Sequence, residues 1–556
     1  MGKVQVVPRP LAEIVHEHLQ HAAPPLAHNI SEERLADWQA DPEIRAHLTS
    51  ITCLDLSTTA LDCIWKKRLD GSNLSLAAYC EQTHLGVLLE CTPGLTTLIL
   101  GRALSVFNSR EIKAVFGAIG RLTKLQSLQL LRLPSDRFID LTEARFSLPH
   151  LVELDICGTA ISSEQALVGV LQHLTGLTTI RMFDDDDNIL PHNMGEGIMV
   201  CKILVKMTAL RSLSINGMAR GGAPVLASNV GCALHGLTQL VDLHVKDDLF
   251  CVEIFGAVST MAALQSLKIN SLEGQGVSLA LVTSLASALC GLTQLGELHL
   301  MRKSFCVDGA TAMAHAIQQL TQLHELKMGL VWTDDGKCWS STEVVHALTA
   351  PLYHLTGLTS LVTYEGICSP ETFRLLATAI GRMTALTCLD VGGYANGCGS
   401  VGAAAIANGL QSLANLSTLR MANNRIGSEG ATNLAHVLLN LVELAELNLD
   451  GNDLLVFNGD SRLGLEVLAP SLARMSNLTS LGMGNNTACR NSRPVENLSD
   501  VSRAIAALAV ALHQKPNLQL LVLPKIDFDL SPETPDAAKE VYGPLGEALL
   551  GMDKLR

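Results

Sequence analysis

The strongest constraint on this chain is a frame of leucines that returns along most of its length. Residues 441–454 read LVELAELNLDGNDL and residues 413–426 read LANLSTLRMANNRI, so the leucines of the two segments coincide when one is laid over the other. We index each unit by the Leu or Ile that opens its Leu-x-Leu-like string, which gives sixteen units with a mean spacing of about 31 residues. The opening residues are Leu54, Leu98, Leu128, Leu154, Ile180, Leu213, Leu243, Leu267, Leu298, Leu326, Leu361, Leu389, Leu419, Leu447, Leu481 and Leu521. A repeat of this length predicts one supersecondary unit per repeat, stacked into an array that grows in one dimension.

Two hydrophobic periods alternate within each unit. Across residues 447–449 the period is two, which predicts a strand with both leucines inside and Asn448 outside. Across residues 108–122 the period is helical, with Ile112, Val115, Phe116 and Ile119 on one face. Pro370 follows a serine and suits the first position of a helix. Because strands are narrower than helices, we expect an α/β solenoid curved like a horseshoe, with a parallel β-sheet on the concave face and helices on the convex face.

The best-formed units resemble the ribonuclease inhibitor-like class of leucine-rich repeats, which also occurs in NOD-like receptors and Ran GTPase-activating proteins. The resemblance covers roughly residues 48–530 and is sharpest in residues 413–454, where NRIGSEGA (424–431) is similar to that class's turn into its helix. It implies that Asn424, Asn452 and Asn486 bond the loop backbone through their side chains. In other units the asparagine position departs from the family pattern and holds Thr59, Thr159, Met218 or Tyr394.

The two ends of the chain suggest a three-part organisation. Residues 1–47 contain two helix-like stretches and are predicted to cap the first repeat. Residues 48–530 form the repeat array. Residues 531–556 are predicted to be a helix followed by the start of a further, truncated repeat, because the terminal MDKLR matches MTALR at 207–211. This match favours a fragment of a longer protein.

Composition and charge argue against several classes of function. The net charge of −14 is unsuited to neutralising phosphates, so we expect no nucleic acid partner. Apolar runs are too short for a spanning helix and the N-terminus lacks the shape of a signal peptide, so no membrane association is expected. Fifteen scattered cysteines without a CxxC pair suit a reducing compartment and predict no zinc site. We therefore expect a cytoplasmic protein, a monomer, without metal or cofactor.

Two motifs that suggest bound groups have structural explanations. Residues 397–402 read GCGSVG, a GxGxxG that follows a strand and opens a helix, as in dinucleotide-binding folds. However, Gly399 to Ala403 align with Gly427 to Ala431 one repeat later, so the motif belongs to the repeat. The N-terminal histidines do not form an HExxH motif, so we interpret them as exposed helix residues; they are His16, His18, His21 and His28.

The concave face offers the best candidate site for a partner. The middle residue of each strand should face solvent there, and repeats five to ten carry a nearly continuous basic row: Arg181, Ser214, His244, Lys268, His299 and Lys327. The position two residues earlier carries Asp242, Glu297 and Glu325, so the face is mixed in sign. Such a surface favours specific pairing with a complementary protein, although a solvated sheet face is the simpler interpretation. If these side chains face solvent, charge reversal at Lys268 and Lys327 should leave the fold intact.

Two loop features are further candidates for contact with a partner. Trp332 and Trp339 lie in one loop, and tryptophans are enriched at interface hot spots, although both can equally pack on a neighbouring helix. Acidic clusters follow three strands, at residues 184–187, 247–248 and 334–335, and can gather a basic partner segment or simply be solvated.

The sequence therefore favours a non-enzymatic module that binds a protein partner mainly through the concave β-sheet face. The family resemblance leaves a small-GTPase activator of the Ran type as an alternative, although this chain has no strongly acidic tail at its end. A substrate receptor of a ubiquitin ligase is a further alternative, because Pro10 to Ile14 and Trp38 loosely resemble an F-box. The sensor part of an immune-type receptor is another. Fold similarity cannot choose among these, because function depends on the site.

Overall fold

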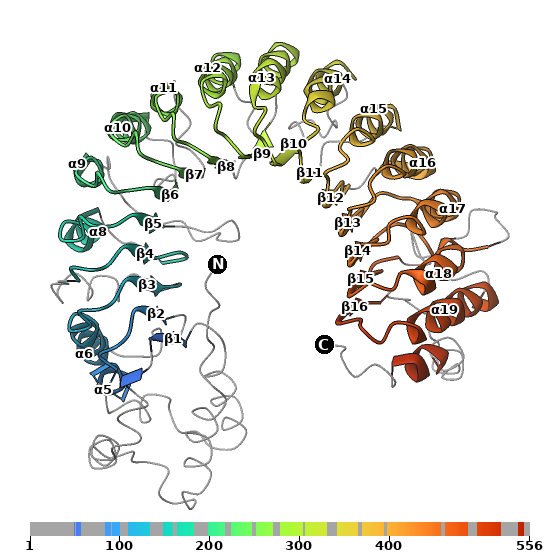
Figure 1. Cartoon of the computed structure of the whole chain (residues 1–556), viewed down its shortest axis with the longest axis horizontal. Helices are drawn as coiled ribbons and strands as arrows, with labels where there is room; N and C mark the ends of the chain where they lie inside the picture. The colour runs from blue at the N-terminus through green and yellow to red at the C-terminus, as the bar shows by residue number, and fades with distance from the viewer. Residues whose placement is uncertain are drawn as a thin grey trace, which may run out of the picture. The chain divides into compact units, whose positions relative to one another are not determined.

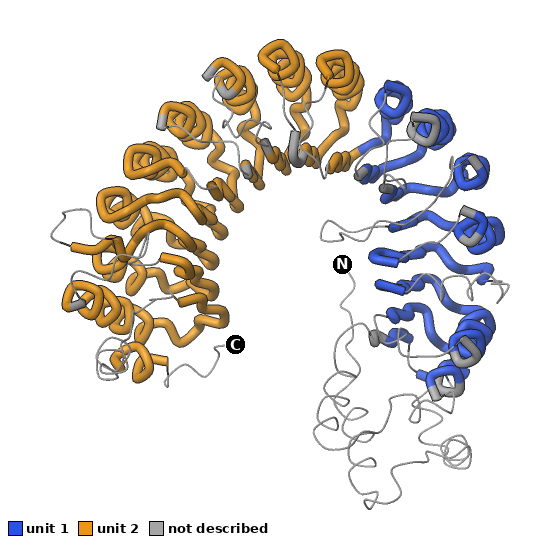
Figure 2. The backbone as a smooth tube through the Cα atoms, turned by 180° about the vertical axis from the view of Figure 1, so that it is seen from behind, with its two compact units in different colours: residues 1–264 blue, residues 265–556 orange. Residues whose placement is uncertain are grey.

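A computed structural model describes the greater part of the repeat array. The described residues are 49–50, 52–56, 84–90, 92–100, 109–133, 148–159, 164–182, 198–216, 224–246, 252–270, 278–303, 306–330, 342–364, 370–393, 397–456, 462–486, 498–523 and 543–549. The chain divides into two compact units, residues 1–264 and residues 265–556 (Figure 2). The predicted cap at 1–47 lies outside the described residues, and of the predicted segment 531–556 only 543–549 is described, as helix. The three-part organisation therefore stays a prediction.

All sixteen predicted strands are present among the described residues. Unit 1 contains β1 (Cys53–Leu56), β2 (Thr97–Leu100), β3 (Ser127–Leu130), β4 (Glu153–Asp155), β5 (Thr179–Arg181), β6 (Ser212–Asn216) and β7 (Asp242–Lys246). Unit 2 contains β8 (Ser266–Asn270), β9 (Glu297–Lys303), β10 (Glu325–Leu330), β11 (Ser360–Tyr364), β12 (Cys388–Asp390), β13 (Thr418–Arg420), β14 (Glu446–Asn448), β15 (Ser480–Gly482) and β16 (Leu520–Val522). Within each unit the strands pair in parallel in chain order.

A helix follows most strands and returns the chain to the start of the next one. Unit 1 contains α5 (His84–Glu90), α6 (Ser109–Ile119), α8 (Glu164–Leu171), α9 (Ile198–Leu204), α10 (Pro224–Leu234) and α11 (Val252–Val258). Unit 2 contains α12 (Leu279–Cys290), α13 (Val307–Gln319), α14 (Thr342–Thr349), the 3₁₀ helix η3 (Ala350–His354), α15 (Pro370–Ile380), α16 (Gly399–Leu410), α17 (Gly427–Leu438), α18 (Gly464–Arg474) and α19 (Leu498–His513). In each unit the strands line the inner side of the arc and the helices its outer side (Figure 1). The fold is therefore an α/β leucine-rich-repeat solenoid, as the sequence predicted.

The leucines of the repeat frame form the core between strands and helices. The residues that open the strands stand opposite one another, as in Leu267 against Leu298 and Leu447 against Leu481. Fifteen of the sixteen are buried, and the exception is Leu521 on the last strand, which is half-buried. The helical face predicted for residues 108–122 is also correct, because its four apolar residues are buried in α6. Pro370 is the first residue of α15, as expected.

Three buried asparagines link the best-formed repeats. The side-chain amide of Asn452 donates to the carbonyl of Met421 in the preceding repeat, at 2.8 Å, and its Oδ1 accepts from the backbone of Asn424, also at 2.8 Å. Asn486 accepts in the same way from the backbone of Asn452, at 2.7 Å. The side chains thus satisfy polar backbone groups where the chain leaves the sheet. The asparagine bonding implied by the family resemblance is confirmed here.

A threonine replaces this asparagine in one divergent repeat and makes equivalent bonds. Thr159 Oγ1 donates to the carbonyl of Leu130 at 2.8 Å and accepts from the backbone N–H of Leu133 at 3.2 Å. A hydroxyl carries both a donor and acceptors, so it can bridge the same two groups of the neighbouring repeat. The departure at Thr159 therefore changes the residue and keeps the link between repeats.

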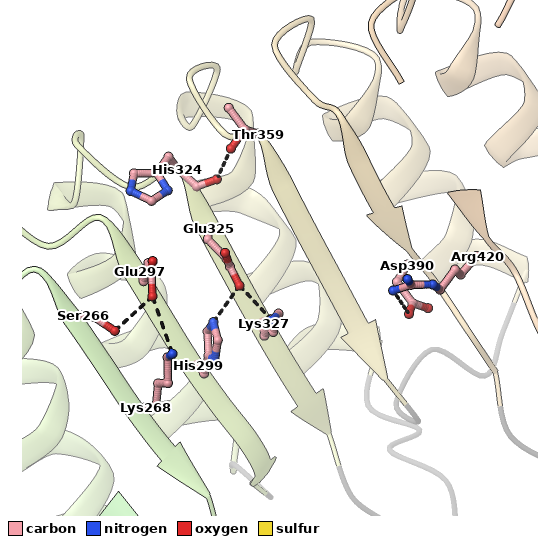
Figure 3. Close-up of polar contacts among 10 residues, drawn as sticks. All are labelled: Ser266, Lys268, Glu297, His299, His324, Glu325, Lys327, Thr359, Asp390 and Arg420. Carbon is pink, nitrogen blue, oxygen red and sulfur yellow. Dashed lines mark hydrogen bonds and ion pairs between the residues drawn. The ribbon is translucent and has the colours of Figure 1, made fainter. Parts of the chain in front are cut away.

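A second row of side-chain bonds runs along the edge where the strands begin. At the residue before the strand, a Ser or Thr hydroxyl donates to the backbone carbonyl of the preceding repeat at 2.9–3.1 Å. Figure 3 shows one of these bonds, from Thr359 to the carbonyl of His324. The donors are Thr96 and Thr178 in unit 1, and Thr359, Thr387, Ser417 and Thr479 in unit 2.

Candidate functional site

The concave face of unit 2 carries two solvent-facing rows of polar side chains. The strand register places Lys268 beside His299, and His299 beside Lys327. The residue two positions earlier on each strand forms the second row, in which Glu297 stands beside Glu325. Neighbouring strands lie about 4.8 Å apart, so long side chains of the two rows can meet diagonally.

Lys268 forms an ion pair with the carboxylate on the next strand. Its Nζ lies 3.7 Å from Glu297 Oε2, and the hydroxyl of Ser266 donates to the same oxygen at 3.0 Å (Figure 3). The Lys268 and Glu297 side chains retain 29% and 33% of their exposure. Both charged groups are thus paired yet accessible from solvent.

Glu325 joins His299 and Lys327 into one cluster. Its Oε1 lies 2.9 Å from His299 Nε2 and 2.7 Å from Lys327 Nζ (Figure 3). The hydrogen bond from His299, together with the bond and charge of Lys327, lowers the pKa of Glu325 to about 2 despite the opposing effect of burial. The His299 side chain is only 8% exposed, whereas Lys327 is 32% exposed. Glu325 is therefore an ionised carboxylate that holds an imidazole in the sheet and a lysine at its surface.

A third cluster lies further along unit 2, on β12 to β14. Arg420 binds Glu446 through two bonds, from Nε to Oε1 at 2.7 Å and from Nη2 to Oε2 at 3.0 Å. Its Nη1 also lies 3.9 Å from the buried carboxylate of Asp390 on β12, and Figure 3 draws these two residues. The two-pronged bond to Glu446 raises the pKa of Arg420 and fixes the plane of its guanidinium group. Arg420 and Glu446 were not among the residues predicted from sequence, although they repeat the diagonal pattern of Lys268 and Glu297.

We call these three clusters the paired-charge face; its residues are Lys268, Glu297, His299, Glu325, Lys327, Asp390, Arg420 and Glu446. A neutral stretch separates the first two clusters from the third, where Ser360, the buried Val362 and Cys388 occupy the rows. Burial raises the pKa of the Cys388 thiol, so this cysteine remains protonated. The face thus presents alternating, mutually compensated charges and not an uncompensated positive strip.

Among the candidate residues of unit 1, Arg181 is compensated in the same way. Arg181 Nη1 lies 3.3 Å from Glu153 and 3.8 Å from Asp155, a carboxylate whose pKa is raised by burial. The hydroxyl of Ser212 donates to Asp242 Oδ2 at 2.7 Å. His244 is half-buried in the middle row, in register with Ser214 on the adjacent strand.

Charge reversal at Lys268 and Lys327 also breaks an ion pair at each position, and the prediction that the fold stays intact remains a prediction. Both side chains are half-exposed, as that prediction assumed, but each is paired with a carboxylate. A glutamate at either position therefore faces a second glutamate across the pair, which is unfavourable in itself. A clean test of this face needs the two partners of a pair to be exchanged together.

Several other predicted features lie outside the described residues. These are Trp332 and Trp339, the acidic clusters at 184–187, 247–248 and 334–335, and the histidines before residue 29. Within the part of the chain that the structure describes, no group of three or more His, Cys, Asp or Glu side chains could hold a metal ion. No described helix is both long and apolar enough to cross a membrane.

Close packing explains two of the three glycines of the GxGxxG string, Gly397 and Gly402, and the third, Gly399, has a φ of +63°. Gly397 has a φ of +42°, and a Cβ atom there would collide with the backbone of Asn424 in the next repeat. A Cβ atom on Gly402 would collide with Cys398 and lie 3.3 Å from Phe373. Burial raises the pKa of Cys398 to about 12, so its thiol stays protonated. The string therefore serves the close approach of neighbouring repeats.

Comparisons with known proteins give no family assignment beyond the fold. No family model and no curated protein matches the chain. Among solved structures, it is similar to an internalin from Listeria monocytogenes, with 17% identity and a TM-score of 0.31 over 73% of this chain and 93% of the internalin. It is also similar to the TLR13–ssRNA13 complex, with 15% identity and a TM-score of 0.34 over 92% of this chain and 62% of that one. The assignment to leucine-rich repeats rests on the repeated strand and helix described above.

Proposed function

We propose that this chain is a non-enzymatic interaction module that binds a protein partner through the concave surface of unit 2. The observation that carries this proposal is the paired-charge face itself. Its charges alternate over several neighbouring strands and are held in place by one another. A partner with the complementary pattern gains contacts, whereas a partner with a shifted pattern meets like charges, so the surface favours specificity over general attraction.

The exposure of these side chains supports a role in binding. Lys268, Glu297, Lys327, Arg420 and Glu446 each retain between 29% and 38% of their side-chain surface. Their positions are fixed from below by the sheet and from the side by their ion partners. Groups that are ordered before binding lose less conformational freedom when a partner arrives.

The chemistry of the face supports binding more than catalysis. Glu325 is held as a stable carboxylate, Arg420 as a stable cation, and the thiol of Cys388 in its protonated form. A general acid or base works best with a pKa near the working pH, and a cysteine nucleophile needs a lowered pKa. These three groups are shifted in the opposite direction.

Exchange of one ion pair tests the proposal without changing net charge or removing the pair. In the double variant Lys268→Glu/Glu297→Lys, the ion pair is kept and the surface pattern is inverted. The matched control is Glu371→Arg/Arg374→Glu, which exchanges an exposed pair on α15, on the outer side of unit 2. The full chain and both variants are used for affinity purification from native cell extract, with captured proteins quantified by mass spectrometry.

We expect the parent chain and the α15 control to capture the same protein, and the concave-face exchange to lose it. Circular dichroism and thermal melting establish that all three chains are folded. If the concave-face exchange captures the same proteins as the parent, the paired-charge face is a solvated surface and the proposal is wrong.

We further propose that the repeats belong to the ribonuclease inhibitor-like class and that the protein is a cytoplasmic monomer. The asparagine links of Asn424, Asn452 and Asn486 support the class, because each donates to a backbone carbonyl of the preceding repeat just after its strand, in repeats that each carry a full helix. The buried thiols of Cys157 and Cys398 lie in the apolar core, which suits a reducing compartment. Size-exclusion chromatography with light scattering tests the oligomeric state directly.

A further inference from the structure

Unit 1 has a second polar surface, at the edge where its strands begin. The turns that join each helix to the next strand lie side by side there, because each donates a backbone bond to the turn before it. Val152 bonds to Gln126, Thr178 to Val152, and Arg211 to Thr178, at 2.7–2.8 Å. These turns form a continuous strip along the edge of unit 1.

The charges in this strip are opposite in sign to the charge of the whole chain. The described turns before β3 to β7 contain Arg121, Lys124, Lys206 and Arg211, all exposed, and no Asp or Glu. The chain as a whole carries a net charge of −14. We call these four residues the basic flank. The corresponding turns before β9 to β13 in unit 2 carry Arg382 as their one Lys or Arg.

Most of the positive charge on the basic flank is uncompensated. Arg121 forms an ion pair with Glu90, at the end of α5. Arg211 instead donates to the amide and carbonyl oxygens of Gln239, at 2.8 and 3.1 Å, which leaves its charge in place. Within the described residues, Lys124 and Lys206 have neither an ion pair nor a hydrogen bond from the side chain. This differs from the paired-charge face, where the lysines and Arg420 are bound to carboxylates.

Stabilisation of the helix ends does not account for Lys124 and Arg211. Cations favour the last turn of a helix, where backbone carbonyls are unpaired, and the effect fades beyond that turn. The last turns of α6, α8 and α10 contain no basic residue, and that of α9 contains Lys202. Lys124 lies five residues beyond the end of α6, and Arg211 seven beyond the end of α9, whereas Arg121 and Lys206 each lie two residues beyond these helices.

We infer that the basic flank of unit 1 binds an acidic segment of a protein partner, as a second surface beyond the proposed concave site. Lys124 precedes β3 and Lys206 precedes β6, three strands later, so about 14 Å or more separates them along the sheet. An extended peptide covers that distance with about four to five residues. Acidic residues at that spacing in one segment can contact both lysines.

A protein segment fits the basic flank better than a nucleic acid does. The described turns before β3 to β7 contain Thr, Gln and His side chains but no Phe, Tyr or Trp on which bases could stack. The negative charge of the whole chain also repels a long polyphosphate, whereas a short acidic peptide interacts mainly with the local cations.

The test uses two labelled probes of similar charge, a decaglutamate peptide and a ten-nucleotide uridine RNA, titrated with the full chain. The variant Lys124→Gln/Lys206→Gln removes the two unpaired charges, and Arg374→Gln/Arg462→Gln removes two exposed charges of unit 2 that belong to neither proposed surface, as the matched control. Binding is measured by fluorescence anisotropy at about 50 mM and about 300 mM salt, because screening weakens exposed charge contacts. Circular dichroism establishes that the variants are folded.

We expect the peptide to bind, to weaken at higher salt, and to lose about fivefold or more in affinity in the flank variant, with less than about a twofold change in the control. Failure of the peptide to bind, or an equal loss in both variants, overturns the inference. Tighter binding of the RNA also overturns it and identifies a nucleic acid surface instead. The concave proposal is tested by the exchanged ion pair, so the two proposals can fail separately.

Discussion

The variant Glu325→Gln tests how strongly one carboxylate secures the concave face of unit 2. Glu325 is the shared partner of His299 and Lys327, and its side chain is 25% exposed. Glutamine keeps the size of the side chain and removes its charge. The substitution therefore isolates the electrostatic part of the cluster.

The pKa of Glu325 sets the magnitude of the effect. It is lowered from 4.5 to about 2, a difference equivalent to about 3 kcal/mol between the two protonation states. Because the folded pKa lies below the unfolded one, this stabilisation is present above pH 4.5 and is lost as the pH falls towards 2. Solvent screening of a partly exposed group reduces it, so we expect about 1–2 kcal/mol at neutral pH.

Urea denaturation followed by circular dichroism, at pH 7 and at about pH 3, measures this contribution. At neutral pH we expect Glu325→Gln to be less stable than the parent, and at about pH 3 the difference should shrink by about half or more. The matched control Glu371→Gln removes an exposed carboxylate that pairs with Arg374 three residues away, and should change stability by less than about 0.5 kcal/mol. A difference between parent and Glu325→Gln that does not depend on pH would refute the electrostatic reasoning.

Three further substitutions test the links between repeats, each by thermal or urea unfolding. Asn452→Ala leaves buried backbone groups of its own repeat and the neighbouring repeat without partners, and should reduce stability by about 2–3 kcal/mol. The control Asn433→Ala, at an exposed helix position, should reduce it by less than about 0.5 kcal/mol. Equal effects would contradict the linking role of Asn452. Gly397→Ala should destabilise by more than about 2 kcal/mol because of its positive φ and the collision with the next repeat, and a neutral result would show that the neighbouring repeat can move away. Lys515→Met removes an ammonium group that donates to the carbonyls of Ala473 and Met475 at the end of α18, at 2.9 and 2.6 Å. We expect stability to fall by about 1–2 kcal/mol. A gain in stability would mean that the cost of burying the Lys515 ammonium, which also lowers its pKa, is larger than the contribution of its two bonds.

The repeat fold could be predicted from sequence because every repeat contains the same pattern of apolar residues. The spacing of two around Leu447 and the helical spacing around Phe116 are local signals, and sixteen copies in register make the pattern unmistakable. The bonds by which Thr159 replaces the loop asparagine could not be predicted in the same way. They depend on a hydroxyl reaching both Leu130 and Leu133 of another repeat, which is a property of three-dimensional packing.

The candidate site was predicted only in outline. The alternation of strand residues correctly placed Lys268 and Lys327 on the solvent-facing side of the sheet, because the side on which a strand residue lies depends only on the period of two. Their pairing with Glu297 and Glu325 was not predicted. For Lys268 it requires comparing a residue in one row with a residue in the other row on the next strand, although the repeat alignment contains the register between these strands. Arg420 and Glu446 were missed for this reason, since the two residues lie in different rows and on different strands.

The diagonal ion pairs also bear on how the strands of unit 2 find their correct alignment. A parallel strand that slides by two residues still turns its leucines inward, so apolar burial alone distinguishes poorly between the native alignment and this slipped one. The two directions of such a slip differ. One would bring Arg420 directly opposite Glu446 and Lys268 directly opposite Glu297, whereas the other would move the partners of each pair apart. The pairs therefore disfavour a slip in the second direction, so that charges suited to recognising a partner also oppose one misaligned form of the protein itself.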